Sequence, residues 1–441
     1  MKLLYNIKHS KEKVSFSEAL IRGLGKNQGL FFPINLPKFS SSEIDTLLKM
    51  NFIERSAYIL SKYIGAELLY ENILTCVKNA FTFPVPLVFI KKNIAILELF
   101  HGPTLAFKDF GSRLMASMLM NQVKEGYKLI KTKPLVILTA TSGDTGAAVA
   151  HAFYGLKNIH VFILYPKDKI SILQEKSFCT LGGNITTISV DGDFDICQSL
   201  VKQSFEDDFL KKKLHLNSAN SINISRLLAQ VCYYFEALSQ ISERIRATNK
   251  LVISVPSGNF GNLTAGLLAQ SSGLPVQCFI IATNLNDTVP RFLQSGIWNP
   301  LPTLSTLSNA MDVSCPSNWS RIEELFRREK RSFDELKYGC VNDELTKDTI
   351  NKLSKLGYIA DPHTAVAYQV LCDQLNCGEF GICLGTAHPA KFKKLIEFVL
   401  DKKVNVLLPD VLKNQIKLPI LSYRISGCFS KLRDLICSIV L

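Results

Sequence analysis

Metal-binding and disulfide motifs are missing from this chain, although it has twelve cysteines among its 441 residues. No two cysteines form a Cys-x-x-Cys pair. The nearest cluster, Cys372, Cys377 and Cys383, has neither zinc-site spacing nor a paired histidine motif. Dispersed cysteines in a long chain are typical of a reduced protein. The sequence therefore predicts no metal site and a cytoplasmic location.

Membrane signals are also missing. The opening MKLLYNIKHSKEK lacks the apolar stretch of a secretory signal. The uncharged stretch 251–286 is long enough to span a membrane, but Pro256, Pro275 and several glycines interrupt it. This pattern indicates a buried α/β core, and no membrane association is expected. The sequence shows neither an internal repeat nor a low-complexity tract.

Negative charge is in short supply, because 51 lysines and arginines face 38 aspartates and glutamates, a net charge of +13. Such an excess can attract nucleic acid, a membrane surface or a small anion. The lysines are scattered, however, and the densest run, at 211–213, has no interleaved aromatic residues. We interpret this run as a solvated helix end and expect no nucleic-acid partner. The excess is compatible with a phosphorylated substrate but does not identify one.

The composition, 47% hydrophobic and 20% charged, is that of a globular protein with an extensive core. Short apolar runs predict strands at 94–100, 135–141, 160–165, 185–190, 251–256, 276–283 and 380–384. Helical periodicity follows some of them, for example at 145–156 and 227–238. This alternation predicts an α/β fold with parallel-rich sheets covered by helices, in which ligands bind beyond the carboxyl ends of strands.

The chain length suits two large lobes and an additional segment. Residues 1–85 are polar and mixed, with helical spacing at 43–60, and two prolines within 81–86 indicate a boundary. We therefore expect an N-terminal segment at 1–85 and a main region at 86–441, to which the resemblance described below assigns the catalysis. Its lobes would cover roughly 86–225 and 226–441.

Lys108 lies in HGPTLAFKDFG (101–111), where a strand ends, the chain turns and a helix is expected to start near residue 106. Phe107 and Phe110 flank it. An apolar pocket and the positive end of a helix dipole both lower the pKa of a lysine amine and so make it a nucleophile. An ordinary surface lysine is the alternative reading.

A second motif, SGNFGN at 257–262, follows an apolar strand and precedes a helix at 263–270. Small residues there allow successive N–H groups to converge on an anion at a helix N-terminus. The loop is neither a Walker motif nor Gly-x-Gly-x-x-Gly, so a nicotinamide dinucleotide is not expected. A glycine-rich turn without a ligand is the alternative.

Two further strand ends carry polar residues. In TATSGDTG (139–146), hydroxyl and N–H groups can hold a carboxylate, although this motif alone favours helix capping by Ser142 or Asp144. In LGTAHPAK (384–391), Thr386 follows a strand. His388 precedes a proline in a turn, which favours a structural role over a catalytic one.

Taken together, these motifs resemble threonine synthases of the long bacterial form, within the fold-type II pyridoxal phosphate family. The resemblance spans nearly the whole chain. It also includes GLGKNQGLFFP (23–33), LQEKSFCTLGGNI (173–185), NSANSINISRLLAQ (217–230) and LSNAMDVS (307–314). It implies a two-lobed architecture like that of the tryptophan synthase β subunit.

The resemblance also implies roles for individual residues. Lys108 would form the Schiff base with pyridoxal 5'-phosphate, and Thr386 would bond the pyridine nitrogen. The cofactor phosphate would be held by Gly258, Asn259, Phe260, Gly261 and Asn262. The loop facing the substrate carboxylate and the cofactor's phenolic oxygen would comprise Thr141, Ser142, Gly143, Asp144 and Thr145. Many fold-type II relatives have asparagine where this chain has Asp144.

The implied reaction is a carbon–oxygen lyase step: phosphate is eliminated from O-phospho-L-homoserine and water is added to give L-threonine. Lys108 would act as the base, with its pKa kept near working pH by the pocket. Arg113 and Arg226 are candidate ligands of the substrate phosphate, with an ordinary ion pair as the alternative for each. The sequence does not decide the oligomeric state, and a monomer is compatible with it.

Three rival interpretations stay open at this stage. A threonine dehydratase or another β-eliminating enzyme would keep the fold but change the substrate. A family member without activity would bind the cofactor or a partner only. A nucleic-acid binder is suggested by the net charge alone.

Overall fold

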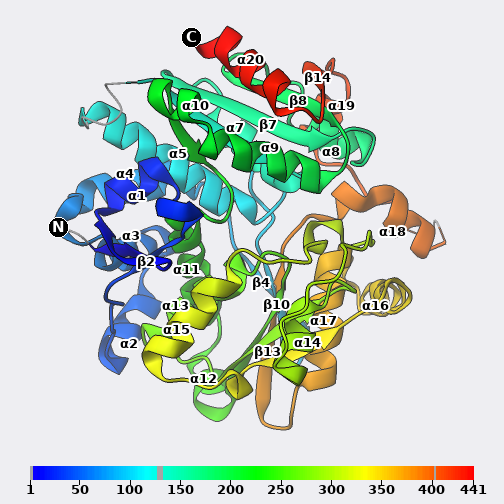
Figure 1. Ribbon diagram of the computed structural model, residues 1–441. Coiled ribbons are helices and arrows are strands. Elements are labelled where there is room, and N and C mark those ends of the chain that lie inside the picture. The colour runs from blue at the N-terminus through cyan, green and yellow to red at the C-terminus, as the bar shows by residue number, and fades with distance from the viewer. Residues whose placement is uncertain (1–2, 127–132, 402–403) are drawn as a thin grey trace.

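Two parallel-rich sheets organise the chain in the computed structural model, which describes residues 3–126, 133–401 and 404–441 (Figure 1). The five-stranded sheet has the order β14-β8-β7-β6-β9, and all its neighbouring strands pair in parallel. Its strands are β6 (Leu135–Ala140), β7 (Ile159–Pro166), β8 (Ile185–Asp191), β9 (His215–Ser218) and β14 (Ser422–Ser426).

The six-stranded sheet has the order β12-β11-β10-β13-β5-β4. Its strands are parallel except for the antiparallel pair of β4 and β5. They are β4 (Leu87–Lys91), β5 (Ile94–Glu98), β10 (Lys250–Pro256), β11 (Cys278–Thr283), β12 (Lys337–Cys340) and β13 (Glu379–Gly385). The predicted α/β class with parallel-rich sheets is confirmed.

Neither large sheet is built from one continuous part of the chain. The early strands β4 and β5 join the sheet of β10, β11 and β13, and the late strand β14 joins the other sheet. Each lobe therefore needs residues from both sides of position 225. The domain limits at 85 and 225 stay predictions.

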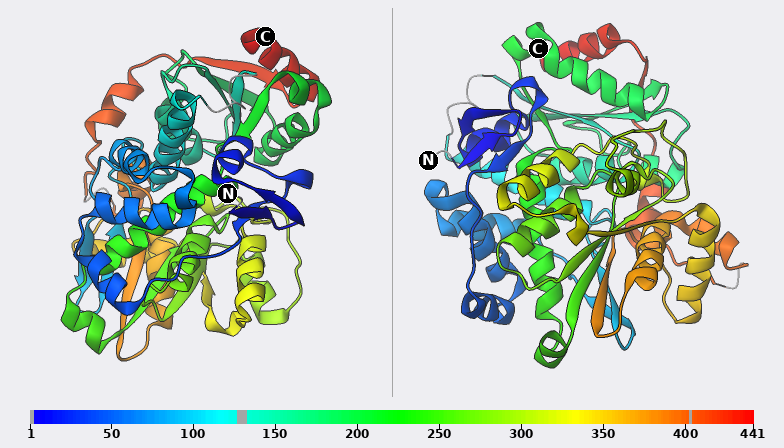
Figure 2. Two further views of the ribbon diagram at one scale, coloured as in Figure 1. Left: turned by 90° about the vertical axis from the view of Figure 1, so that its left-hand side faces the viewer. Right: turned by 60° about the horizontal axis from the view of Figure 1, so that its bottom comes forward.

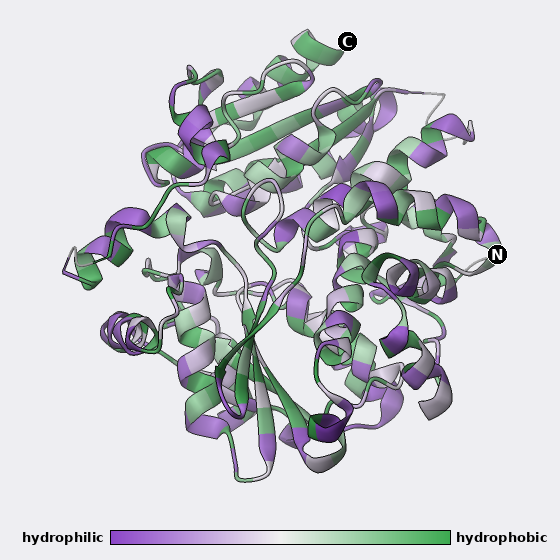
Figure 3. Cartoon of the chain, turned by 180° about the vertical axis from the view of Figure 1, so that it is seen from behind, coloured by the Kyte–Doolittle hydropathy of each residue, from purple (hydrophilic) through white to green (hydrophobic). Residues whose placement is uncertain are grey.

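All seven predicted strands are confirmed to within two residues at either end, because unbroken apolar runs are buried on both faces of a parallel sheet. Figure 3 shows these strands as mainly hydrophobic. The predicted helical stretch 43–60 is instead two helices, α2 (Ser41–Lys49) and α3 (Phe52–Ile64). They are separate because the Asn51 side chain accepts the N–H of Glu54 and starts a new helix.

Helices cover the sheets and connect their strands. In the first half they are α1 (Phe16–Arg22), α4 (Tyr70–Ala80), α5 (Lys108–Lys124), α7 (Asp144–Phe153), α8 (Ile172–Lys176), α9 (Phe194–Glu206) and α10 (Asp208–Lys213). Those that follow are α11 (Ile224–Ser239), α12 (Glu243–Thr248), α13 (Gly261–Ser271), α14 (Thr288–Ser295), α15 (Trp319–Glu329), α16 (Asp343–Lys355), α17 (Pro362–Gln374), α18 (Lys393–Val399), α19 (Asp410–Ile416) and α20 (Phe429–Val440). Short 3-10 turns are η1 (Lys26–Gln28), η2 (Gly65–Glu67), η3 (Asn309–Met311), η4 (Phe333–Glu335) and η5 (Pro389–Phe392).

The run at 211–213 forms the exposed last turn of α10, as predicted. The described residues include no helix long and apolar enough to cross a membrane.

The N-terminal segment packs along one side of both lobes (Figure 2). Its antiparallel sheet has the order β2-β1-β3, with β1 (Leu4–Asn6), β2 (His9–Val14) and β3 (Phe31–Pro33). Helices α2 and α3 contact α11, and α4 contacts α5. Because α5 begins at Lys108, the segment supports the helix that carries the candidate nucleophile.

Candidate active site

A pocket lies where strands of both large sheets end. Thr141 follows β6, Ser257 follows β10 and Thr386 follows β13, which is where ligands bind in open α/β sheets. The lining residues from the predicted motifs are Lys108, Thr141, Ser142, Asp144, Thr145, Arg226, Gly258, Asn259, Phe260, Gly261, Asn262 and Thr386. Motifs that are far apart in sequence thus meet in one cavity.

Lys108 is the first residue of α5, as the sequence predicted for the first helical turn. Burial lowers the pKa of its amine to about 8, and the charges of Lys391 and Arg226 act in the same direction, against the pull of Asp144. Its Nζ lies 6.0 Å from the centre of the Phe107 ring. A substantial fraction of the amine is therefore free near neutral pH, as a nucleophile requires.

A main-chain contact brings Lys108 next to Thr386. Ala106 and Ala387 form an antiparallel bridge, and the N–H of Phe107 donates to the Thr386 carbonyl over 2.9 Å. The end of β13 thereby pairs with the turn that leads into α5. The hydroxyl-bearing Thr386 and the lysine both line the pocket.

Asp144, the first residue of α7, forms a buried ion pair with Lys391 over 2.5 Å. Burial would raise the pKa of this carboxyl. The charges of Lys391 and Lys108 outweigh it, and the pKa falls to about 2. Lys391 also donates to the Thr104 carbonyl over 3.1 Å. The Asp144 carboxylate therefore lines the pocket with its negative charge neutralised by Lys391.

Neither Ser142 nor Asp144 caps α7, so the capping alternative for this motif is wrong for both side chains. The Thr141 hydroxyl takes this place by accepting the N–H groups of Gly143 and Gly146 at 2.9 and 2.8 Å. Gly143 has φ +134°, a conformation that favours glycine. Gly143 shapes the loop and is not itself part of the pocket lining.

The loop 258–262 leads into α13 through Phe260, whose backbone is left-handed at φ +60°. No side chain caps this helix. Within the described part of the chain, no acceptor receives the N–H groups from Gly258 to Asn262. The Asn262 amide nitrogen has no partner there either, although its oxygen accepts the hydroxyls of Tyr233 and Tyr234 at 2.5 and 2.7 Å. These free donors at a helix N-terminus are what an anion needs.

The two candidate arginines are placed differently. Arg226 lines the pocket, donates to the Ala219 carbonyl, and leaves its Nε without a partner among the described residues. Burial lowers its pKa to about 10, so it stays charged at neutral pH. Arg113 is not brought to the pocket. Its guanidinium donates to the carbonyls of Ala80 and Asn79 at 2.7 and 2.9 Å, so this candidate for the substrate phosphate is corrected to a structural link between α5 and the end of α4.

His388 has a structural role, as predicted, because its side chain accepts the N–H of Ala390 at the start of η5. The sequence reasoning assigned no role to His363 or Lys391. His363 lines the pocket, and its Nε2 accepts the Ala310 N–H over 3.1 Å. Its Nδ1 lies 2.7 Å from the Oδ1 of Asp361. Only their position in the fold distinguishes these two from other buried polar residues.

The site suits an aldehyde that bears a phosphate group. It combines a lysine amine of lowered pKa with a loop of free N–H donors and an amide donor without a partner. Among the described residues no cluster of histidine, cysteine, aspartate or glutamate could hold a metal ion.

Comparison with known proteins agrees with this chemistry. The family model for pyridoxal-phosphate dependent enzymes matches residues 85–382, and that for the threonine synthase N terminus matches residues 5–81. The threonine synthase of Escherichia coli K12 is 60% identical over 432 residues, 98% of each chain.

Solved structures give the same result. The crystal structure of threonine synthase from Escherichia coli matches with a TM-score of 0.94 at 59% identity, covering 100% of both chains. The pyridoxal-phosphate-bound threonine synthase from Brucella melitensis matches with a TM-score of 0.89 at 31% identity, also covering 100% of both chains. The fold-type II architecture expected from the sequence is confirmed. The chain belongs to the threonine synthase family of pyridoxal-phosphate-dependent enzymes.

Proposed function

We propose that this chain converts O-phospho-L-homoserine and water to L-threonine and phosphate, with pyridoxal phosphate carried on Lys108. The observation that carries the proposal is the lysine amine of lowered pKa in one pocket with a loop of free N–H donors. Pyridoxal phosphate, when bound, supplies the electron sink that stabilises negative charge on the substrate carbons.

Lys108 has two tasks in this proposal. Its free amine would hold the cofactor through the aldehyde. Once freed by the substrate amine, it would remove one proton at a time, from Cα and then, after passing that proton on, from Cβ. The same side chain, charged after the second of these transfers, would return that proton to Cγ after phosphate leaves. A pKa of about 8 suits both directions of transfer.

The remaining pocket residues would hold and orient the cofactor and the substrate. Gly258 to Asn262 would bind the cofactor phosphate through their N–H groups, and the hydroxyl of Thr386 would contact the pyridine nitrogen. A neutral partner there would leave that nitrogen largely unprotonated and so restrain side reactions.

The substrate would lie between Lys108 and the loop 141–145. Its carboxylate would bind at the loop's hydroxyl and N–H groups. The pairing of Asp144 with Lys391 supports this, because it keeps the loop from repelling an anion. Arg226 would bind the substrate phosphate, since its buried charge has a free Nε.

Two further properties belong to the proposal. A monomer would suffice for activity, because one chain supplies all the residues assigned here. A cytoplasmic location is supported by the cysteines, which are all free. Sedimentation of the active protein and fractionation of cells would test these two points.

The test of the function is to incubate the purified protein with pyridoxal phosphate and O-phospho-L-homoserine and to measure phosphate and threonine. Both products should appear in equal amounts. Lys108→Ala should reduce turnover by about a thousandfold or more. The matched control Lys211→Ala, in the exposed end of α10, should behave as wild type. Release of ammonia and ketoacid from threonine, without threonine synthesis, would instead support a dehydratase.

A further inference from the structure

Arg321, on α15, is fully buried and has no carboxylate partner among the described residues. Its donors reach main-chain carbonyls and one side-chain amide instead. The acceptors are the carbonyls of Phe31, Ser221 and Ile222 and the Oδ1 of Asn318, at distances from 2.7 to 3.2 Å. All three nitrogens of the guanidinium are therefore engaged, so the side chain is held in one position.

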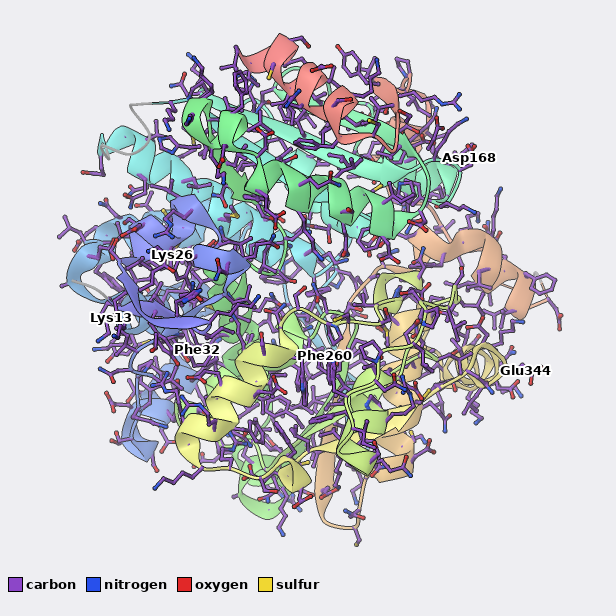
Figure 4. The ribbon with its side chains drawn as sticks, in the orientation of Figure 1. Lys13, Lys26, Phe32, Asp168, Phe260 and Glu344 are labelled. Atoms are coloured by element: carbon purple, nitrogen blue, oxygen red, sulfur yellow. The ribbon has the colours of Figure 1, made fainter. Side chains whose placement is uncertain are left out.

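These acceptors come from three separate parts of the chain. Phe31 is in β3 of the N-terminal segment, Ser221 and Ile222 follow β9, and Asn318 precedes α15. Figure 4 labels Phe32, next to Phe31, and Phe260, in the glycine loop, on either side of α15. Arg321 thus joins the N-terminal segment to the lobes beside the pocket.

One more set of hydrogen bonds reaches the pocket itself. The Asn318 amide donates to the Asn259 carbonyl over 3.0 Å and to the Ser221 hydroxyl over 3.1 Å. The Asn259 amide donates to the same hydroxyl over 3.0 Å, and its Oδ1 accepts the N–H of Ser317 over 2.6 Å. Both polar atoms of the Asn259 side chain are thereby occupied by the protein. Its main-chain N–H has no acceptor among the described residues and can bind a ligand.

The charge of Arg321 is a second consideration. Burial alone lowers its pKa to about 9, so the guanidinium is still charged at neutral pH. A buried charge surrounded only by dipoles is costly to hold. An anion bound at the loop 258–262 would reduce that cost and would be attracted in return.

We propose that Arg321 is a positioning residue: with Asn318 and Ser221 it holds the loop 258–262 in the shape that binds the cofactor phosphate, and it adds positive potential there. The N-terminal segment contributes the Phe31 carbonyl that holds Arg321 in place. This inference rests on the function proposed for the same site.

The experiment compares pyridoxal phosphate with pyridoxal, which has the same aldehyde but no phosphate. Full-length protein freed of cofactor is titrated with each compound, and the covalent adduct on Lys108 is followed by absorbance and confirmed by borohydride reduction and peptide mass. The ratio of the two affinities reports on the phosphate subsite alone. A substitution that destabilises the whole fold lowers the affinities for both compounds together and leaves their ratio unchanged.

In Arg321→Met the affinity for pyridoxal phosphate should fall by about tenfold or more, whereas the affinity for pyridoxal should change by less than about threefold. Arg321→Lys, which keeps the charge but not the forked geometry, should recover part of the loss. Ser221→Ala is the milder variant, for use should Arg321→Met not fold. It removes the hydroxyl shared by Asn259 and Asn318. Like Arg321→Met, it should lower the affinity for pyridoxal phosphate relative to that for pyridoxal.

Arg55 provides the control, although unlike Arg321 it has a carboxylate partner, Glu236. It is also a fully buried arginine, it bonds the carbonyls of Leu47, Leu48 and Met50, and it does not line the pocket. Arg55→Met should lower stability without changing the affinity ratio. An unchanged ratio in Arg321→Met or Ser221→Ala, or an equal change in Arg55→Met, would overturn the inference. Failure of the wild-type protein to form any adduct would overturn the proposed function instead.

Discussion

At the scale of single residues, the site depends on an amine that loses its proton unusually easily. With a pKa of about 8, roughly a tenth of Lys108 is uncharged at pH 7, against far less than 1% for an ordinary lysine. The cause is burial, reinforced by the cations Lys391 and Arg226. The rest of the chemistry follows from this shift, because a protonated lysine cannot attack an aldehyde.

We expect the rate of adduct formation between cofactor-free protein and pyridoxal phosphate to rise with pH and to reach half its plateau near pH 8. The sign follows from the free amine, whose fraction grows as the proton is lost. Borohydride trapping at intervals between about pH 6.5 and 9.5 measures the rate. A midpoint above about pH 10 would mean that the pocket does not perturb Lys108.

Lys391 should matter for stability because it neutralises Asp144. The folded-state pKa of Asp144, about 2, is below its ordinary value of 3.8, so the pair stabilises the fold above about pH 4 and loses that effect as the pH falls toward 2. Lys391→Met leaves a buried carboxylate without its partner and should cost about 3 kcal/mol at pH 7. Denaturant unfolding measures this loss.

The double variant Lys391→Met with Asp144→Asn provides the control, since it removes both charges at once. It should recover most of the stability lost in the single variant. Equal stability of the single and double variants would show that the ion pair does not act as a unit.

At the scale of elements, three helices have their N-termini at the pocket, and in none of them does the N-cap residue itself accept a helix N–H through its side chain. They are α5, α7 and α13, which follow Phe107, Gly143 and Phe260. Helices elsewhere, such as α2, α3 and α9, begin with a serine, asparagine or aspartate that accepts a helix N–H. At α7 the Thr141 hydroxyl accepts the Gly146 N–H instead, whereas at α13 the N–H groups of residues 258–262 have no acceptor among the described residues and can serve a ligand.

Gly258 should be required for the shape of the glycine loop. A Cβ there would lie 2.8 Å from the Cα of Met311 and 3.0 Å from the carbonyl oxygen of Ala310, both backbone atoms of η3. Gly258→Ala should therefore weaken pyridoxal phosphate binding by about tenfold or more while the protein stays folded. Equilibrium titration followed by absorbance measures the change.

Gly155→Ala is the comparison for this prediction. Gly155 has φ +74° and nothing within 4 Å of the added carbon, so alanine should cost only about 1 kcal/mol of stability and leave cofactor affinity unchanged. Loss of affinity in both variants would point to general destabilisation rather than to the loop.

At the scale of the whole molecule, the net charge of +13 should favour the approach of an anionic substrate. We expect kcat/KM for O-phospho-L-homoserine to fall roughly threefold between about 50 and 300 mM salt, because screening weakens long-range attraction. The value of kcat should change little, since charges inside the pocket are shielded from salt. Steady-state kinetics in sodium chloride measure both, and a constant kcat/KM would contradict the prediction.

Much of the fold could be predicted because its central strands are continuous apolar runs, such as β6 and β10, and such runs are buried wherever they are placed. Strands with mixed composition escaped prediction. The strand β14 has exposed polar positions and pairs with β8 across more than two hundred residues. Its sequence alone does not distinguish it from a loop.

The site residues also divide into those that could be predicted from the sequence and those that could not. Lys108, Thr386 and the loop 258–262 could be identified because each follows a strand in a motif that a known family shares. Arg113 and Arg226 were indistinguishable in sequence, yet one bonds the end of α4 and the other lines the pocket. Lys391 lies at the end of the motif 384–391 but was given no role there, and Arg321 lies in none of the motifs.

The sequence by itself therefore determined the family and the secondary structure of the core, and it singled out the candidate nucleophile, because these depend on local pattern and on a recognisable order of motifs. Only the tertiary structure decided which charges compensate one another: Lys391 beside Asp144, Arg226 at the pocket wall, and Arg321 between the N-terminal segment and the glycine loop. The reason is physical, since the energy of a buried charge depends on neighbours that the fold brings from distant parts of the chain.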